Sequence, residues 1–248
     1  MLLMILKEAN ITYIFHSSFM VETKNHILIF DYIKNNNLDI NTLNNKLSYS
    51  TKKIYVFVTH SHDDHFDPDI FSLKELNSNI KFIISDDISI DKKIENLYYI
   101  SQYNLLEFDN ILIETYGTTD KGLSYFVETD GLNIYHSGDL NWWHWKNDER
   151  KARIKEEEDY KKEIDLLRDK VIDISFVPVD PRLEEYYYLS AEYFIDTIGP
   201  QLLIPMHFGD KIDITHQLNN KLIHKYSKSK IWEINAPLEV YNFSKDKE

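Results

Sequence analysis

The sequence predicts an α/β fold in which two mixed β-sheets carry helices on their outer faces. The N-terminal part reads as consecutive strands, and the remainder alternates strands with helices. Several expected strands are apolar along most of their length, which is typical of strands buried on both faces; examples are 54–59, 174–179 and 201–206. Two facing sheets with helices packed outside them would bury all of these segments.

Local signals place the turns and the first helix. Thr23-Lys24-Asn25 is expected to join the first two strands as a hairpin, and Asp130-Gly131 is a strong turn signal between two later strands. Asp67 is expected to cap a short helix over 69–76, with Pro68 at its first position. The strands are expected at 11–23, 26–33, 54–59, 80–85, 110–116, 123–129, 132–137, 174–179, 201–206, 231–234 and 238–243.

Three further helices are expected. Residues 148–170 are highly charged, but apolar residues recur at helical spacing in the second half, at Tyr160, Ile164, Leu167 and Val171. The first half shows no apolar stripe, so a charged helical insertion is expected at about 146–170 within a single domain spanning 1–248. The second of these helices is expected to begin at Ser190, as the N-cap, and to end at Gly199-Pro200. Its inner face would carry Ala191, Phe194, Ile195 and Ile198. The third is expected over 213–226.

Composition excludes several classes of function. With 28 Lys and Arg against 41 Asp and Glu, the net charge is −13. This argues against binding a nucleic-acid backbone, because each neutralised phosphate needs a local cation. The chain has no cysteine, so neither a disulfide nor a thiolate metal site can form. Its 6 glycines all lie at or after position 117, which removes glycine-rich nucleotide-binding loops.

Hydropathy gives an expectation about location. The N-terminal apolar stretch before Lys7 and Glu8 is too short for a secretory signal, and no cleavage site of small residues follows it. No segment approaches the ~18 consecutive apolar residues of a membrane span. The expectation is therefore a soluble, cytoplasmic protein; a homo-oligomer is among the states that the sequence allows.

The strongest chemical signal is the segment THSHDDH (59–65), which follows a buried strand directly. At extended spacing His60 and His62 project to the same side, and Asp64 and His65 can point to a second centre once the chain turns toward the helix. Imidazole nitrogens and carboxylate oxygens are ligands for zinc, iron or manganese. The plain alternative is a hydrophilic loop that happens to be rich in histidine, and the density of histidines disfavours it.

Two further strand ends carry residues of the same kind. Asp139 follows the strand 132–137 after a glycine that permits a sharp turn, and His207 ends the strand 201–206. Binding sites of α/β sheets lie at the carboxyl ends of the strands. A lone His207 would more often be a buried histidine held by hydrogen bonds, but three such strand ends together favour a metal site.

At this point the residues resemble a family. HSHDDH (60–65) matches the HxHxDH signature of the metallo-β-lactamase superfamily, and YHSGD (135–139) and PMH (205–207) look like its later motifs. Those two look closest to the branch of ascorbate-6-phosphate lactonase and N-acyl-phosphatidylethanolamine phospholipase D. The resemblance covers about residues 11–243. It implies a four-layer αββα sandwich and two divalent metal ions, the first held by His60 and His62, the second by Asp64, His65 and His207, with Asp139 as the bridge.

One position departs from the family pattern. The family supplies a third histidine to the first metal from a strand end that corresponds here to residues 115–120, and this segment has none. His136 faces away from Asp139 in an ideal strand, which favours a place behind the ligands. The remaining alternatives are His144, Asp120, His16 and a weak or empty first site.

Two residues are expected to bind the substrate. His144 lies in a loop with three tryptophans soon after Asp139, so it is expected to face the cleft; the alternative is a packed loop histidine. Arg182 follows another strand end at the same rim and can hold an anion. The alternative for Arg182 is a surface ion pair with Glu184 or Glu185.

These features predict a metal-dependent hydrolase. Two divalent ions, zinc first with manganese or iron as alternatives, would activate a water, and the catalytic Asp64 would orient it. The chain has no GxSxG motif, so an acyl-enzyme mechanism of that type is not expected. The expected substrate is a small ester, lactone or phosphodiester, with an anionic group admissible. The rival hypothesis is a non-catalytic protein of the same fold that binds metal or senses a ligand, and the missing histidine keeps it open.

Overall fold

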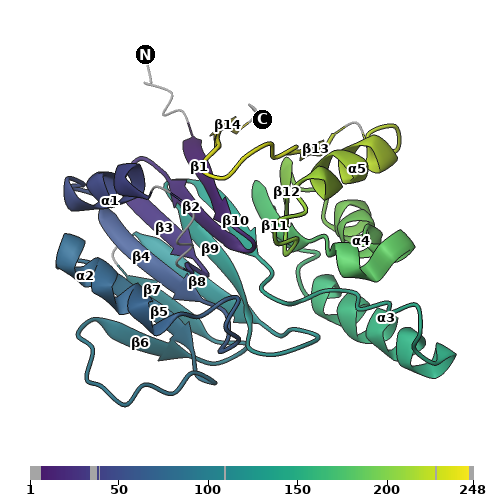
Figure 1. Cartoon of the computed structure of the whole chain (residues 1–248), viewed down its shortest axis with the longest axis horizontal. Helices are drawn as coiled ribbons and strands as arrows, with labels where there is room; N and C mark the ends of the chain where they lie inside the picture. The colour runs from purple at the N-terminus through teal and green to yellow at the C-terminus, as the bar shows by residue number, and fades with distance from the viewer. Residues whose placement is uncertain (1–6, 34–37, 39, 109, 227, 246–248) are drawn as a thin grey trace.

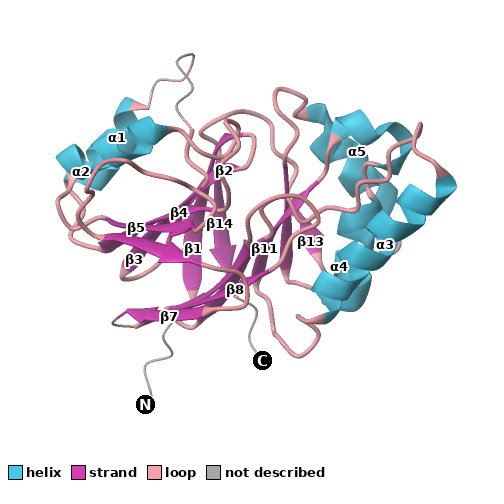
Figure 2. Cartoon of the chain, turned by 90° about the horizontal axis from the view of Figure 1, so that it is seen from below, coloured by secondary structure: helices cyan, strands magenta, loops and turns pink. Residues whose placement is uncertain are grey.

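The computed structural model describes residues 7–33, 38, 40–108, 110–226 and 228–245, and it confirms the predicted fold class (Figure 1). Two seven-stranded mixed sheets face each other. Helices cover the outer side of both sheets, α1 and α2 on one and α3, α4 and α5 on the other (Figures 1 and 2). Their bounds are α1 (Asn41–Ser48), α2 (Leu73–Leu76), α3 (Arg150–Asp165), α4 (Leu189–Thr197) and α5 (Asp213–Leu222).

The first sheet has the order β14-β1-β2-β3-β4-β5-β6. Neighbours from β14 to β3 are antiparallel, and neighbours from β3 to β6 are parallel. Its strands are β1 (Glu8–Phe15), β2 (Ser18–Glu22), β3 (His26–Phe30), β4 (Lys53–Val58), β5 (Lys81–Ser85), β6 (Leu97–Ile100) and β14 (Val240–Ser244).

The second sheet has the order β13-β12-β11-β10-β9-β8-β7. Here β13, β12, β11 and β10 run parallel to one another, and β10, β9, β8 and β7 alternate in direction. Its strands are β7 (Leu105–Phe108), β8 (Ile111–Tyr116), β9 (Ser124–Thr129), β10 (Leu132–His136), β11 (Ile174–Pro178), β12 (Leu202–Met206) and β13 (Lys230–Ile231).

The main core lies between the two sheets. Phe57 of β4 meets Tyr125 of β9 edge to face, with ring centroids 5.1 Å apart, and Phe19 of β2 packs on Phe176 of β11 at 4.6 Å. A second core lies under α1 and α2 and uses the outer faces of β3, β4 and β5. The central parallel strands β3, β4 and β5 are therefore buried on both faces along most of their length, as their apolar runs predict.

Several predicted elements differ from the structure. Residues 11–23 form two strands, because His16 adopts a left-handed conformation (φ 52°) that turns the chain between β1 and β2. The helix expected over 69–76 is a 3₁₀ turn over Pro68–Ser72 followed by α2, with Asp67 as the predicted cap. Ser190 does not cap α4, since its hydroxyl is engaged by the amide N–H of Trp142 and by Asn141. The prediction also omitted α1, β6 and β7.

The charged helix is anchored only through its second half. In α3 the buried residues are Tyr160, Glu163 and Ile164, and Glu163 accepts hydrogen bonds from the Tyr103 hydroxyl and the Gly117 amide. Within the described ranges, no helix combines the length and the apolar character needed to cross a bilayer.

Candidate metal centre

Candidate ligands come from loops at the carboxyl ends of strands in both sheets. The segment 60–65 follows β4 of the first sheet, whereas Asp139 follows β10 and His207 follows β12 of the second. His16 comes from the turn between β1 and β2, which brings it close to His207; their rings lie 4.2 Å apart. The site therefore exists only when the two sheets have packed together.

Two groups of ligand-type atoms meet at this point. In one group, the ring nitrogens and carboxylate oxygens of His16, Asp64, His65 and His207 all lie within 4.8 Å of one another. In the other, the same holds for His60, His62 and Asp139. Within the second group, His60 Nε2 lies 3.0 Å from His62 Nδ1.

Asp139 faces both groups. Its Oδ1 lies 3.0 Å from His65 Nε2 and 3.3 Å from His207 Nε2, and its Oδ2 lies 3.4 Å from His60 Nε2. The neighbouring imidazoles hold the pKa of this buried carboxyl well below its usual range, although burial alone would raise it. This is the arrangement expected of a carboxylate that bridges two cations.

The chemistry of the donor set fits metal ions. Nε2 of His65, Nε2 of His207 and Oδ1 of Asp139 are buried and have no aligned hydrogen-bond partner. Buried polar atoms without partners are costly, so their convergence needs an explanation. Divalent transition metals such as zinc take nitrogen and oxygen ligands of this kind.

A further set of residues orients the imidazoles from behind. The Asp31 carboxylate lies 2.7 Å from His65 Nδ1, and the Asp180 carboxylate lies 3.1 Å from His207 Nδ1. Burial would raise the pKa of Asp180, but hydrogen bonds from His207 and Arg182 lower it to about 2. Carboxylates in these places fix the ring orientation and tautomer of metal-binding histidines.

The sequence analysis did not identify Asp31 and Asp180 as partners of the candidate ligands. Asp180 follows the end of β11, and Asp31 follows the end of β3. Each therefore stands at a strand end, which is the signal that identified Asp139 and His207. Each lies far along the chain from the histidine that it contacts, so the pairs Asp31–His65 and Asp180–His207 could not be predicted from spacing.

The structure places the candidates for the missing third histidine at different distances from the two groups. His136 is buried behind the site, donates from Nε2 to the Ser17 carbonyl at 3.0 Å and stacks on Phe30, so it does not belong to either group. His16 joins the group of Asp64 rather than that of His60. Asp120 lines a cavity together with His62 and Asp139.

His144 is not brought to either group. Its ring packs on Tyr186 at 4.3 Å, and it is absent from the described residues that line the adjoining cavities. Its tryptophan neighbours do reach the site. Trp143 packs edge to face on His207 and stacks on Trp145, whereas the ring contacts of His144 are with Trp142 and Tyr186.

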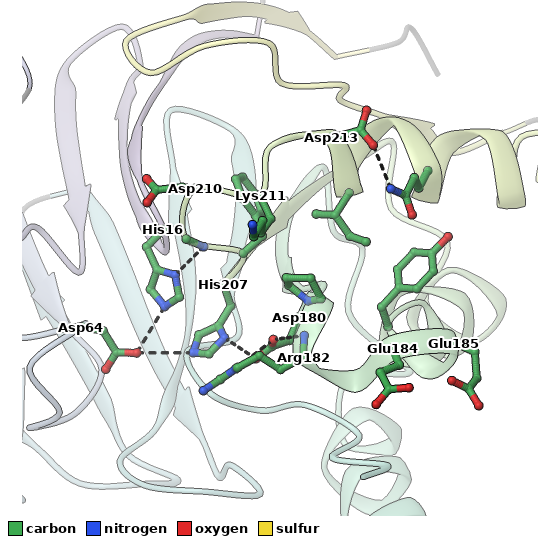
Figure 3. Close-up of a pocket in the computed structure, with 16 residues that line it drawn as sticks. His16, Asp64, Asp180, Arg182, Glu184, Glu185, His207, Asp210, Lys211 and Asp213 are labelled. Atoms are coloured by element: carbon green, nitrogen blue, oxygen red, sulfur yellow. Dashed lines mark hydrogen bonds and ion pairs between the residues drawn. The ribbon is translucent and has the colours of Figure 1, made fainter. Parts of the chain in front are cut away.

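Two cavities meet at the candidate ligands. The larger is about 970 Å³ and the smaller about 400 Å³, and both are bounded by Asp64, Arg182 and His207. Figure 3 shows the residues that line the larger one. Arg182 does not pair with Glu184 or Glu185, which contact Lys146 instead. Its guanidinium is held by Asp180 and lies over the Trp145 ring.

Comparisons with known proteins agree with this geometry. Residues 10–207 match the family model described as "Beta-lactamase superfamily domain". A curated relative from Staphylococcus carnosus, named a metal-dependent hydrolase, is 21% identical over 176 residues, which cover 62% of this chain and 67% of the relative.

Solved structures share the fold at low identity. Igni18, described as a novel metallo hydrolase from Ignicoccus hospitalis, has a TM-score of 0.67 at 18% identity and covers 95% of this chain and 98% of its own. CmlA, a diiron β-hydroxylase from Streptomyces venezuelae, has a TM-score of 0.63 at 8% identity over 96% of this chain and 54% of its own.

Proposed function

Since this chain belongs to the beta-lactamase superfamily, we propose that it is a metal-dependent hydrolase acting on a small ester, lactone or phosphodiester. The observation that carries the proposal is Asp139, whose two oxygens face two separate groups of imidazoles. A structural metal site needs a single closed set of ligands, whereas paired sites serve hydrolysis in many enzymes.

His60 and His62 would hold a first ion, Asp64, His65 and His207 a second, and Asp139 would bridge them. Zinc is the ion that this donor set suits first, and manganese and iron are the alternatives. When bound, such a pair supplies a hydroxide near neutral pH and a Lewis acid for the attacked group.

Asp64 is the residue that would orient the attacking water. Its side chain is 49% exposed, whereas that of Asp139 is 4% exposed, so Asp64 is the acid at this centre that solvent reaches. From this position its carboxylate can accept a hydrogen bond from water and receive a proton.

Arg182 supports an anionic substrate. Its side chain is 61% exposed and stands where both cavities border the ligands, so an anion bound at the metals would lie next to a fixed positive charge. The low pKa of Asp180 keeps that carboxylate ionised and the guanidinium in place. These features suit a small phosphorylated lactone or ester, or a phosphodiester, which are the substrates that fit the family branch resembled by YHSGD (135–139) and PMH (205–207).

The experiment is metal analysis of protein purified without chelator, paired with a screen of generic phosphodiester and lactone substrates. We expect up to two transition metals per chain and turnover of at least one substrate. Replacing Asp64 by Asn should lower turnover by about a hundredfold or more, since a carboxamide cannot accept the proton. Asp63→Asn is the matched control, because Asp63 is exposed and lies outside both groups.

Each outcome has a distinct meaning. Protein without metal, even after dialysis against zinc, manganese or iron, would refute the proposed hydrolase. Protein that binds metal but turns over no substrate would favour the non-catalytic alternative. Equal activity of Asp64→Asn and wild type would show that Asp64 has been given the wrong role.

A further inference from the structure

The hydrogen bonds at Nδ1 divide four histidines of the site, His16, His60, His65 and His207, into two kinds. Behind the proposed ligands His60, His65 and His207, Nδ1 faces an oxygen, of Thr59, Asp31 and Asp180 respectively. An oxygen acceptor places the ring proton on Nδ1 and leaves the Nε2 lone pair free for a metal.

His16 has the opposite arrangement. The backbone N–H of Gly209 donates to His16 Nδ1 at 3.0 Å, so this nitrogen uses its lone pair and carries no proton. A neutral imidazole has one N–H and one acceptor nitrogen. The proton of His16 must therefore lie on Nε2, which is buried and 3.3 Å from Asp64 Oδ2 (Figure 3). Like Nε2 of His65 and His207, this atom has no aligned hydrogen-bond partner, so the position of Nδ1 and its donor is what distinguishes His16.

A metal at His16 Nε2 would conflict with this contact. A neutral imidazole that binds metal through Nε2 carries its proton on Nδ1, and that proton would point at the Gly209 N–H. An imidazolium would create the same clash between two donors.

The backbone holds His16 in place at two further points. Its N–H donates to the Tyr13 hydroxyl at 3.2 Å, and its carbonyl accepts from the His207 N–H at 3.3 Å. Both His16 and His207 have positive φ, at 52° and 63°, which is uncommon for residues other than glycine. Such strain persists where the surrounding contacts over-determine the geometry, and it is frequent at functional sites.

We propose that His16 presents an N–H to the Asp64 carboxylate and is not a fourth ligand of the second metal. Its role is to position Asp64 through Oδ2, the oxygen that also lies 3.7 Å from Nε2 of His207. The inference rests on the proposed metal centre. This role explains why His16 lies close to Asp64 and His207 although its Nδ1 faces a donor, the Gly209 N–H.

His136 provides an internal reference for this tautomer. Its Nε2 donates to the Ser17 carbonyl, and its Nδ1 accepts from the Gly138 N–H at 3.3 Å. It is therefore a buried histidine with the same proton placement as His16 and no place in either ligand group.

The direct test is long-range ¹H–¹⁵N NMR of protein labelled with ¹⁵N-histidine, recorded without metal and with zinc. We expect the His16 ring, identified by its loss in His16→Gln, to show a protonated Nε2 in both states, as His136 does. An unprotonated or zinc-shifted Nε2 of His16 would overturn the proposal. The metal-free spectrum reports the tautomer even if wild-type protein binds no zinc, which would refute the proposed function instead.

A second test uses zinc affinity, measured by competition with a chelator. His16→Gln keeps an N–H donor near the Nε2 position, so it should bind zinc within about threefold of wild type. His16→Ala loses the donor and should bind about tenfold more weakly, the usual effect of removing a residue that orients a ligand. His207→Gln is the control for loss of a ligand. Equal losses in His16→Gln and His207→Gln would identify His16 as a ligand and overturn the proposal.

Discussion

Asp180 connects two parts of the site that the sequence presents as separate. One carboxylate bonds both His207, a proposed ligand, and Arg182, the proposed anion-binding residue. Arg182 also lies over the Trp145 ring, Trp145 stacks on Trp143, and Trp143 packs on His207. These side chains therefore contact one another in a ring that begins and ends at Asp180. We therefore expect a change in any one of them to affect His207, the proposed ligand.

Asp180→Asn should weaken zinc binding by about 10–100-fold, because the neutral amide orients His207 less firmly and lowers the basicity of its ring. The measurement is zinc affinity by chelator competition. Glu184→Gln is the control, since the Glu184 carboxylate pairs with Lys146 at the surface and an exposed pair contributes little. Unchanged affinity in Asp180→Asn would show that Asp180 does not orient His207.

Sequence reasoning identified the candidate ligands that carry a local signal. His60, His62, Asp64 and His65 stand in one short segment, and Asp139 and His207 each follow an apolar strand. The position of His16 could not be predicted, because it depends on a turn with positive φ between β1 and β2 and on the approach of the loop after β12. Neither feature has a signature in the order of residue types.

At the scale of elements, apolar runs predicted the buried strands but did not predict β6 and β7, which lie at the edges of the two sheets. β12 is buried throughout and β4 is buried from its second residue on, so their composition alone identifies them. In contrast, β6 and β7 are outer strands of 4 residues each, and most of their residues are half-exposed or exposed. Their segments, LYYI and LLEF, are apolar but too short to show a period, and pairing with a neighbouring strand completes them.

The anchoring of α3 gives a prediction with a control on the same helix. Ile164→Ala should destabilise the protein by about 2–4 kcal/mol, because Ile164 is fully buried and a cavity remains. Ile154 is 43% exposed on the first half of α3, so Ile154→Ala should change stability by less than about 0.5 kcal/mol. Urea denaturation measures both values. Equal effects would contradict anchoring through the second half.

A hydrogen-bonded cluster joins the β2–β3 turn to the β9–β10 hairpin. Asp130 accepts from the Thr23 hydroxyl at 2.6 Å and from the Asn25 backbone at 2.8 Å, and these bonds lower its pKa although burial raises it. Asp130→Asn should lower the free energy of unfolding by about 1–3 kcal/mol near neutral pH. Asparagine tolerates the positive φ of this position, but its side-chain NH₂ would face groups that themselves donate hydrogen bonds.

The pH dependence of that effect follows from the direction of the shift. The folded pKa of Asp130 lies below its ordinary value of 3.8, so its stabilisation is complete above 3.8 and is lost as the pH falls through the folded pKa. Urea denaturation of wild type and Asp130→Asn should therefore give stabilities that converge toward acid. A difference that stays constant down to the lowest pH would contradict the role of the charged carboxylate.

At the scale of the whole molecule, the candidate ligands connect the two sheets. His60 to His65 follow a strand of the first sheet, and Asp139 and His207 follow strands of the second. An unfolded chain cannot hold these groups together, so a metal that binds them favours the folded state by mass action. Metal binding and the packing of the sheets are thus thermodynamically linked.

Zinc should therefore raise the melting temperature of chelator-treated protein in a concentration-dependent way. At a hundredfold excess over the dissociation constant the gain is about 2.7 kcal/mol, or roughly 5–10 °C for a chain of this size. Asp139→Asn removes the bridging charge and should lose most of this increase, whereas Asp63→Asn should retain it, because Asp63 lies outside both ligand groups. Differential scanning calorimetry at several zinc concentrations measures the shift. A melting temperature independent of zinc would mean that these side chains converge for a reason other than binding metal, since a ligand selective for the folded state cannot bind without stabilising it.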